Sequence, residues 1–189
     1  GQGDVYLKLF IEKIVKLPLT DEDYKHATVA YEYMISDKRR IDIVIITPNY
    51  RIPIEVKIYA GDQKNQCHDY YQWAVNSNVY YITIEGRMPA KSSLASLQPS
   101  QITCVSFEKD IIHWLEKCMT TIQTVHVTSI REIIRQMIEA IRLFCGEVGD
   151  EEMNETLQLI MRDKETMKNA KLIQEAFEKS HGEMIRKVF

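Results

Sequence analysis

The stretch IPIEVKIY, residues 52–59, sets the architecture, because it places a Glu and a Lys inside a run of β-branched and aromatic residues. Such residues favour a β-strand, in which side chains two positions apart point to the same face of the sheet. Glu55 and Lys57 are therefore expected to project together, with Val56 on the other face. Charges in an apolar strand are costly to bury unless they are paired or bind an ion. The stretch predicts a strand with a polar site on one face.

A second apolar stretch, RRIDIVII at residues 39–46, places Asp42 13 positions before Glu55. If the two strands are neighbours, two carboxylates and the Lys57 ammonium meet at one point. Mg²⁺ prefers such oxygen ligands, and the backbone carbonyl of Val56 is a further candidate. Phosphodiester hydrolysis needs this set, because a metal activates water while Lys57 orients or deprotonates that water or stabilises developing charge. The alternative is a structural salt bridge on a half-buried strand.

The composition is that of a globular domain. The chain has 189 residues, 45% of them hydrophobic, and a net charge of −3, which argues against a polybasic binder but allows an enzyme with a local basic cleft. The four cysteines form no CxxC pair, which favours reduced thiols in a cytoplasmic protein. No apolar run is long enough to span a membrane, and no signal peptide is recognisable. A start at Gly1 without a methionine is expected of a fragment or a processed protein.

The order of elements predicts an α/β fold with one central sheet covered by helices. The expected elements are a helix over 4–16, a polar connection over 19–25, strands over 26–35, 41–47 and 52–59, a helix over 61–76, a strand over 79–85, a loop over 87–101, a strand over 102–107 and a helix over 108–118. Asp62 is the expected cap of the helix over 61–76. From Ser129 onward the pattern is helical, with a capping box at residues 129–132 and helices over 129–144, 152–162 and 165–179. We expect a core over 1–146, including its last helix, and a helical tail over 147–189 that packs on the core or on a partner.

Residues 40–73 resemble the PD-(D/E)xK nuclease superfamily. The stretch IEVKIYAGDQ, residues 54–63, followed by Gln66 and Tyr70, is similar to an uncharacterised bacterial branch of that superfamily. The resemblance implies a restriction-endonuclease-like α/β fold, that is, a central mixed sheet flanked by helices, here with a C-terminal helical extension. It also implies a metal-dependent nuclease, with Mg²⁺ as the cofactor and Mn²⁺ as a substitute.

The resemblance also implies roles for single residues. Asp42, Glu55 and Lys57 match the catalytic motif, and Asp42, Glu55 and the Val56 carbonyl are the expected metal ligands. Gln66 and Tyr70 match a Q-x-x-x-Y helix motif, in which the Gln positions the catalytic groups or the nucleic acid, and the Tyr packs or contacts the backbone of the nucleic acid.

Other residues allow two interpretations. Arg40 is expected to contact phosphate or, alternatively, to balance nearby carboxylates. The aromatic residues that follow the site either stack on unpaired bases or pack in the core; they are Tyr70, Tyr71, Trp73, Tyr80 and Tyr81.

These observations predict a cytoplasmic, magnesium-dependent nuclease that acts on nucleic acid, with DNA as the expected substrate and no membrane partner. Two alternatives are a nucleic-acid-binding member of the fold whose site is inactive, and a protein-interaction domain that uses the tail as its partner surface. DNA or RNA as substrate and internal or terminal cleavage are all compatible with the sequence. Cleavage of both strands of a duplex generally needs two active sites, which would favour a homodimer.

Overall fold

The structure, a computed structural model, describes residues 2–37 and 39–146, and beyond them only 159, 162, 165–169, 171–172 and 175. The chain divides into two units, Gly1–Cys145 and Gly146–Phe189, and the account below concerns the first. The predicted helices over 152–162 and 165–179 fall largely outside the described residues. In the part of the chain that is described, no helix is both long and apolar enough to cross a lipid bilayer.

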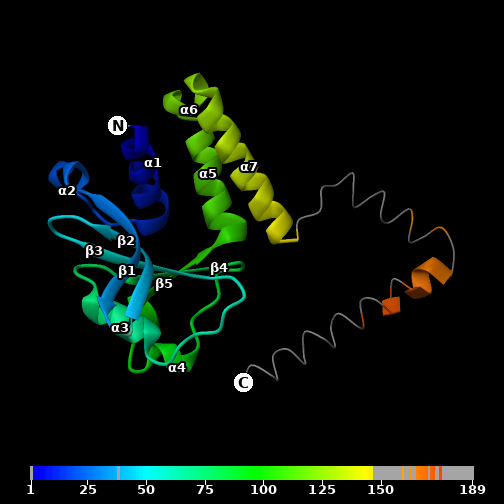
Figure 1. The fold of residues 1–189 in the computed structure, drawn as a ribbon, viewed down its shortest axis with the longest axis horizontal. Helices are drawn as coiled ribbons and strands as arrows, with labels where there is room; N and C mark the ends of the chain where they lie inside the picture. Colours follow the sequence, from blue (N-terminus) through cyan, green and yellow to red (C-terminus); the bar gives the residue numbers. More distant parts are fainter. Residues whose placement is uncertain are drawn as a thin grey trace. The chain divides into compact units, whose positions relative to one another are not determined.

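A five-stranded mixed sheet forms the centre of the first unit (Figure 1). Its strands, in spatial order, are β1 (Thr28–Ser36), β2 (Arg39–Ile46), β3 (Arg51–Lys57), β4 (Val79–Thr83) and β5 (Ile102–Ser106). β1 and β3 both pair antiparallel with β2, whereas β4 pairs in parallel with both β3 and β5. All five predicted strands are confirmed, and the sheet with its helices is the expected α/β architecture.

Helices cover both faces of this sheet. They are α1 (Gln2–Phe10) with a π-helical turn (Ile11–Val15), α2 (Asp21–Lys25), α3 (Gln66–Trp73), α4 (Lys91–Leu94), α5 (Ile112–Met119), α6 (Ile122–His126) and α7 (Thr128–Phe144). Residues of α1, α5 and α7 join the hydrophobic cluster on one face, and residues of α3 and α4 join the cluster on the other. Figure 1 shows the two groups on opposite sides of the strands.

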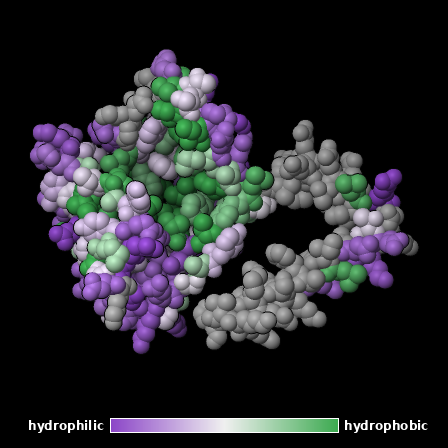
Figure 2. Space-filling view, viewed as in Figure 1, coloured by the Kyte–Doolittle hydropathy of each residue, from purple (hydrophilic) through white to green (hydrophobic). Residues whose placement is uncertain are grey.

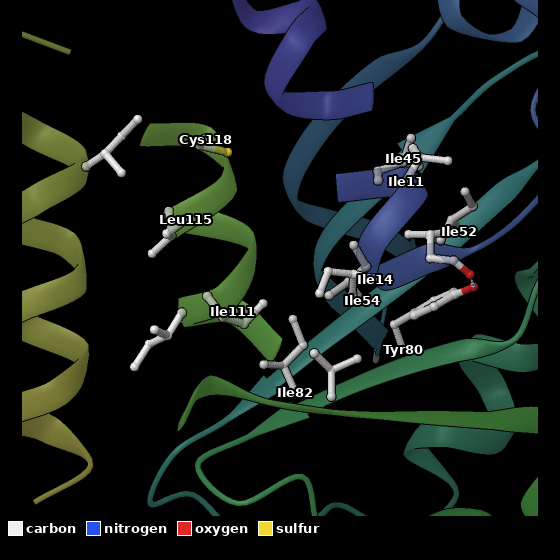
Figure 3. Packing of buried hydrophobic residues seen from close by; sticks show 14 of the residues in the cluster. Ile11, Ile14, Ile45, Ile52, Ile54, Tyr80, Ile82, Ile111, Leu115 and Cys118 are labelled. Carbon is white, nitrogen blue, oxygen red and sulfur yellow. Dashed lines mark hydrogen bonds between the residues drawn. The ribbon is translucent and has the colours of Figure 1, made fainter. Parts of the chain in front are cut away.

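Alternation along β3 separates an apolar face from a polar one. Ile52 and Ile54 are buried against the α1 and α5 side, where Figure 3 shows them beside Ile11, Ile14 and other aliphatic side chains. Glu55 and Lys57 belong to the alternate positions, on the α3 side. This arrangement confirms the prediction that these two charged residues share one face of the sheet.

The predicted starts of two helices, α3 and α7, are wrong. α3 begins at Gln66 rather than at residue 61, because Asp62 does not cap a helix. The Asp62 carboxylate instead accepts hydrogen bonds from the Tyr81 hydroxyl (2.6 Å) and the Ala90 amide (2.8 Å). The expected capping box at 129–132 also fails, because α7 already begins at Thr128 and its N-cap, Val127, makes no side-chain capping bond.

The predicted polar connection over 19–25 contains a short helix, α2, with a capping box formed by Thr20 and Asp23. Asp23 is fully buried and also accepts hydrogen bonds from Thr47 Oγ1 (2.8 Å) and from Asn49. Burial by itself would raise the pKa of Asp23, but the hydrogen bonds from Thr20, Thr47 and Asn49 together lower it well below its usual range. This carboxylate ties α2 to the turn between β2 and β3, so its role is structural.

In the edge strand β1, Glu32 has a left-handed φ of 53°. On either side of it, Tyr31 pairs with Ile43 and Tyr33 pairs with Ile41, so the register places Glu32 opposite Asp42. The Glu32 carboxylate forms an ion pair with Arg40 of β2. The left-handed residue of β1 thus lies opposite Asp42, where the strand passes the candidate site.

A wholly apolar hollow of about 420 Å³ lies between the sheet and the helices that cover its first face. Its lining comes from α1, the strands, α5 and α7, and includes Phe10, Ile54, Trp114 and Met137. Figure 2 shows hydrophobic side chains gathered in a hollow on this side of the molecule. The polar face of β3 points away from this hollow, so the two features are independent.

Gly86, which follows β4, has a φ of +78°, and a Cβ atom there would lie 3.2 Å from the Cβ of Ser106. We expect Gly86→Ala to lower the free energy of unfolding by more than about 1 kcal/mol, because an L side chain is strained at this φ and also crowds β5. Urea unfolding followed by circular dichroism measures the loss. Gly61→Ala is the matched control, since nothing lies within 4 Å of its added Cβ. Equal unfolding midpoints for the two variants would contradict this account.

Candidate active site

The antiparallel pairing of β2 and β3 brings the two predicted carboxylates together. The ladder includes Ile43 opposite Ile54, and one further step of the same register places Asp42 opposite Glu55. At this step the Val56 amide donates a hydrogen bond to Asp42 Oδ2 (2.8 Å). The Asp42 side chain thus takes the position of a ladder hydrogen bond, which holds its carboxylate at the end of β3 beside Glu55.

Glu55 lies at the centre of the polar cluster and is 1% exposed. Its Oε1 atom accepts from Lys57 Nζ (2.7 Å) and from Gln66 Nε2 (2.7 Å). Lys57 is also buried, and so is Gln66 at the start of α3. The structure therefore brings the predicted residues Glu55, Lys57 and Gln66 into direct contact.

The second Glu55 oxygen, Oε2, is buried and has no hydrogen-bond partner among the described residues. Burial raises the pKa of Glu55 to about 7; the Lys57 hydrogen bond opposes this rise, and the Asp42 charge adds to it. A buried carboxylate oxygen without a partner is unfavourable for the fold. It indicates that the site is shaped for a group that the protein chain itself does not provide.

Tyr70 supports this cluster from α3. Its hydroxyl donates to the Arg40 carbonyl (2.6 Å) and accepts from Gln66 Nε2 (3.0 Å). Tyr70 is only 1% exposed, and burial raises the pKa of its hydroxyl above the usual range, so the group stays protonated and can donate. Of the two roles that the resemblance implies for Tyr70, this burial favours packing: in this structure Tyr70 packs inside the fold and links α3 to β2. Tyr80 and Tyr81 are buried as well, which favours the core interpretation of the aromatic cluster.

The predicted metal ligands are the side chains of Asp42 and Glu55 and the backbone carbonyl of Val56, and together they could hold a divalent cation. Asp42 offers a carboxylate of which one oxygen, Oδ2, receives the Val56 amide, and Glu55 offers the unpartnered Oε2. In an extended strand the N–H and C=O of one residue point to the same neighbour, so the Val56 carbonyl projects toward β2 and Asp42. Hard oxygen donors of this kind suit Mg²⁺ or Mn²⁺. In the described part of the chain, this site included, no group of three or more His, Cys, Asp or Glu side chains could hold an ion, so the side-chain ligands here are the two carboxylates alone.

Two arginines, Arg39 and Arg40, precede Asp42 on β2, and they differ in burial and in the groups that they contact. Arg39 is largely buried and donates to Asp69 Oδ2 (2.6 Å), to Gln63 and to the Lys64 carbonyl, so it fixes the segment that leads into α3. The side chain of Arg40 is exposed and forms the ion pair with Glu32. Arg40 therefore lies at the surface beside the cluster, where it balances a carboxylate and also faces solvent.

The segment that follows β4 also lies near the site. Thr83, the last residue of β4, pairs with Lys57, and its Oγ1 accepts from the Arg87 amide (2.8 Å). Tyr81 pairs with Glu55 and donates to Asp62. These contacts result from the parallel pairing of β3 with β4, and no local pattern in the sequence predicts them. The one available signal is Gly86, a turn residue that follows the end of β4 at Thr83.

The family model described as "PD-(D/E)XK nuclease superfamily" matches residues 1–139. The match covers the five strands and most of α7, and it includes all the residues of the polar cluster. No curated protein and no solved structure matches the chain.

Proposed function

The chain belongs to the PD-(D/E)XK nuclease superfamily, and on that basis we propose that it is a metal-dependent nuclease that hydrolyses phosphodiester bonds in DNA. Membership confirms the predicted family and the restriction-endonuclease-like α/β fold. It also indicates nuclease activity in general, a nucleic-acid substrate and the use of divalent metal ions. The choice of DNA, of Mg²⁺ and of the individual site residues is our proposal.

The observation that carries this proposal is the unpartnered Oε2 of Glu55, which is buried beside Lys57 and close to Asp42. The unpartnered oxygen favours a bound cation over a purely structural salt bridge, because a carboxylate oxygen buried without a partner is unfavourable. A cation held by Asp42, Glu55 and the Val56 carbonyl would satisfy this oxygen.

Each residue of the cluster has a distinct part in the proposed reaction. A bound Mg²⁺ would lower the pKa of a coordinated water and offset charge on the phosphate. Lys57 is held 2.7 Å from Glu55 and would orient or deprotonate the attacking water, or stabilise the negative charge that develops on the phosphate. Gln66 fixes the Glu55 carboxylate through Oε1, and Tyr70 in turn fixes Gln66. Arg40, at the surface, is our candidate contact for the nucleic-acid backbone.

We further propose the wider setting of the reaction. The nuclease core would comprise residues 1–146, the tail over 147–189 would pack on that core or on a partner, and cleavage of a duplex would use two copies of the chain. A cytoplasmic location is supported by the thiols of Cys67, Cys104 and Cys118, which are free in the structure and suit a reducing compartment.

The test is cleavage of plasmid DNA and labelled oligonucleotides in Mg²⁺ or Mn²⁺ against a chelator control. We expect cleavage only with metal, and we expect Asp42→Asn to reduce the rate by at least about a hundredfold, because charge stabilisation by a metal is worth several kcal/mol. Asp21→Asn, at an exposed position in α2, should retain the wild-type rate.

Two other outcomes would replace the proposal. Binding of DNA without any metal-dependent cleavage would favour an inactive nucleic-acid-binding member of the fold. A chain that shows no affinity for DNA even at low salt, where phosphate contacts are strongest, would favour a protein-interaction domain.

A further inference from the structure

Arg87 is fixed at the same end of the sheet as the polar cluster. β4 ends at Thr83, the left-handed Gly86 turns the chain, and the Arg87 amide then donates back to Thr83 Oγ1 (2.8 Å). Thr83 is the partner of Lys57 in the parallel ladder between β3 and β4. The backbone of Arg87 is therefore anchored to the residue that lies next to Lys57.

Its side chain is directed toward the same end. The guanidinium carbon lies 5.9 Å from the ring centroid of Tyr81, and Tyr81 pairs with Glu55 across the same two strands. Nη1 of Arg87 is 3.8 Å from Asp62 Oδ2, which is longer than a hydrogen bond. Asp62 itself is 3% exposed in its side chain and already accepts from the Tyr81 hydroxyl and the Ala90 amide. A ring and a buried carboxylate thus hold the guanidinium in place without using most of its donors.

The donors of Arg87 are available to a ligand. A guanidinium carries five N–H groups. Within the described residues, the Arg87 guanidinium makes one hydrogen bond, a long one from Nη1 to the Met88 carbonyl (3.4 Å). Its side chain is 49% exposed, whereas that of Arg39 is 18% exposed and donates to three partners. Arg39 therefore stabilises the fold, whereas Arg87 is held in position with most of its N–H donors available.

We propose that Arg87 binds a phosphate of the substrate strand next to the cleavage site, an inference that rests on the proposed nuclease function. The planar fork of a guanidinium matches two oxygens of a phosphodiester, and stacking on a ring restricts its motion before binding. The negative charges of Asp42 and Glu55 repel a nucleic-acid strand. The positive charge of Arg87, added to that of Lys57, offsets this repulsion where the nucleic acid approaches the site. Arg87 is thus a substrate-positioning residue supplied by the loop that follows β4.

The test measures binding of a fluorescein-labelled oligonucleotide, single-stranded and duplex, with Ca²⁺ in place of Mg²⁺ to slow cleavage. Arg87→Ala should weaken binding about tenfold, because one charge-assisted contact is lost. It should also reduce the slope of log Kd against log salt by about one, as expected for the loss of one phosphate contact. Arg87→Lys should keep the salt slope and lose part of the affinity, because a lysine keeps the charge but not the fork.

Arg51→Ala is the matched control. Arg51 begins β3, at the end of the strand opposite to Lys57, and its guanidinium lies 5.8 Å from the Trp73 ring in an arrangement similar to that of Arg87. This variant should bind like the wild type. Thermal unfolding of each variant shows whether the fold is intact, and Arg87→Lys provides the comparison if Arg87→Ala is poorly folded.

The outcomes separate the two proposals. If the wild type cleaves DNA and Arg87→Ala binds with the same affinity and salt slope as Arg51→Ala, the role of Arg87 is wrong and the nuclease function stands. If the wild type binds no nucleic acid at any salt concentration, both proposals fail.

Discussion

Lys57→Ala should slow metal-dependent cleavage by about 10²–10⁴-fold, which is the range for loss of a positioned acid–base or charge-stabilising group. Lys57 donates to Glu55 from within the buried face of β3, so no solvent-exposed lysine can replace it. The measurement is the single-turnover rate on labelled DNA in saturating Mn²⁺, with circular dichroism to confirm folding.

Removal of Lys57 also changes the pKa of Glu55, and the experiment must separate this effect from the loss of a catalytic group. The Lys57 hydrogen bond and charge both lower the pKa of Glu55, so the variant should hold that carboxyl protonated to a higher pH. A slower reaction could therefore reflect weaker metal loading rather than a lost catalytic group. Rates measured above pH 8 at several Mn²⁺ concentrations distinguish the two causes. Lys117→Ala, an exposed position in α5, is the control. A Lys57→Ala rate within about threefold of the wild type at saturating metal would remove Lys57 from the mechanism.

The metal-free protein should become less stable as pH rises from about 4.5 to about 7, because of Glu55. Its pKa is raised from 4.5 in the unfolded chain to about 7 in the folded one, mainly by burial. Between these values the folded state holds a proton that the unfolded state has released, so the free energy of unfolding falls with pH. The loss from this one group is at most about 3 kcal/mol. Glu55→Gln should remove it, since the amide does not titrate.

Added Mn²⁺ should reverse this trend. Metal binding requires the ionised carboxylate, so the rise in Tm on adding Mn²⁺ should grow with pH through about 7 and should be absent in Glu55→Gln. Differential scanning fluorimetry between pH 5 and pH 8.5, with and without the ion, measures both effects. Glu116→Gln, at an exposed position in α5, should behave like the wild type. A metal-induced shift that is independent of pH, or that persists in Glu55→Gln, would exclude Glu55 as a ligand.

The choice of pH window keeps a second carboxylate out of the measurement. The pKa of Asp23 is lowered in the folded state by hydrogen bonds that outweigh its burial. Its stabilising contribution is therefore complete above its unfolded pKa of 3.8 and is lost only as pH falls below that value. Each effect is read as the difference between the wild type and Glu55→Gln at the same pH.

Short-range patterns predicted much of this fold and of the polar cluster. The strands around Asp42 and Glu55 are runs of β-branched residues, and period-two alternation was sufficient to place Glu55 and Lys57 on one face. The short turn between β2 and β3 then brings Asp42 opposite Glu55. The inclusion of Gln66 came from the family resemblance, because no local rule indicates that the first residue of a helix reaches a strand.

The errors came from contacts that join distant segments. Asp62 precedes a helix and has the residue type of a cap, yet it bonds to Tyr81 and Ala90, which reach it only through the crossover to β4. The sequence left open whether Tyr70 packs or contacts nucleic acid, because its burial depends on the Arg40 carbonyl, 30 residues earlier in the chain. The position of Arg87, in the predicted loop over 87–101, follows from the pairing of β3 with β4, which no local pattern indicates. The catalytic roles themselves stay predictions until they are tested.

The left-handed conformation of Glu32 also bears on self-association. β1 is an edge strand, and its exposed side chains include Val29, Tyr31 and Met34, so a straight β1 would offer its open backbone to a strand of another molecule. A left-handed residue in its middle, paired with Arg40, is irregular for a strand, so we expect it to turn some edge amides and carbonyls away from such a partner. We therefore expect this irregularity to oppose aggregation by edge-to-edge pairing.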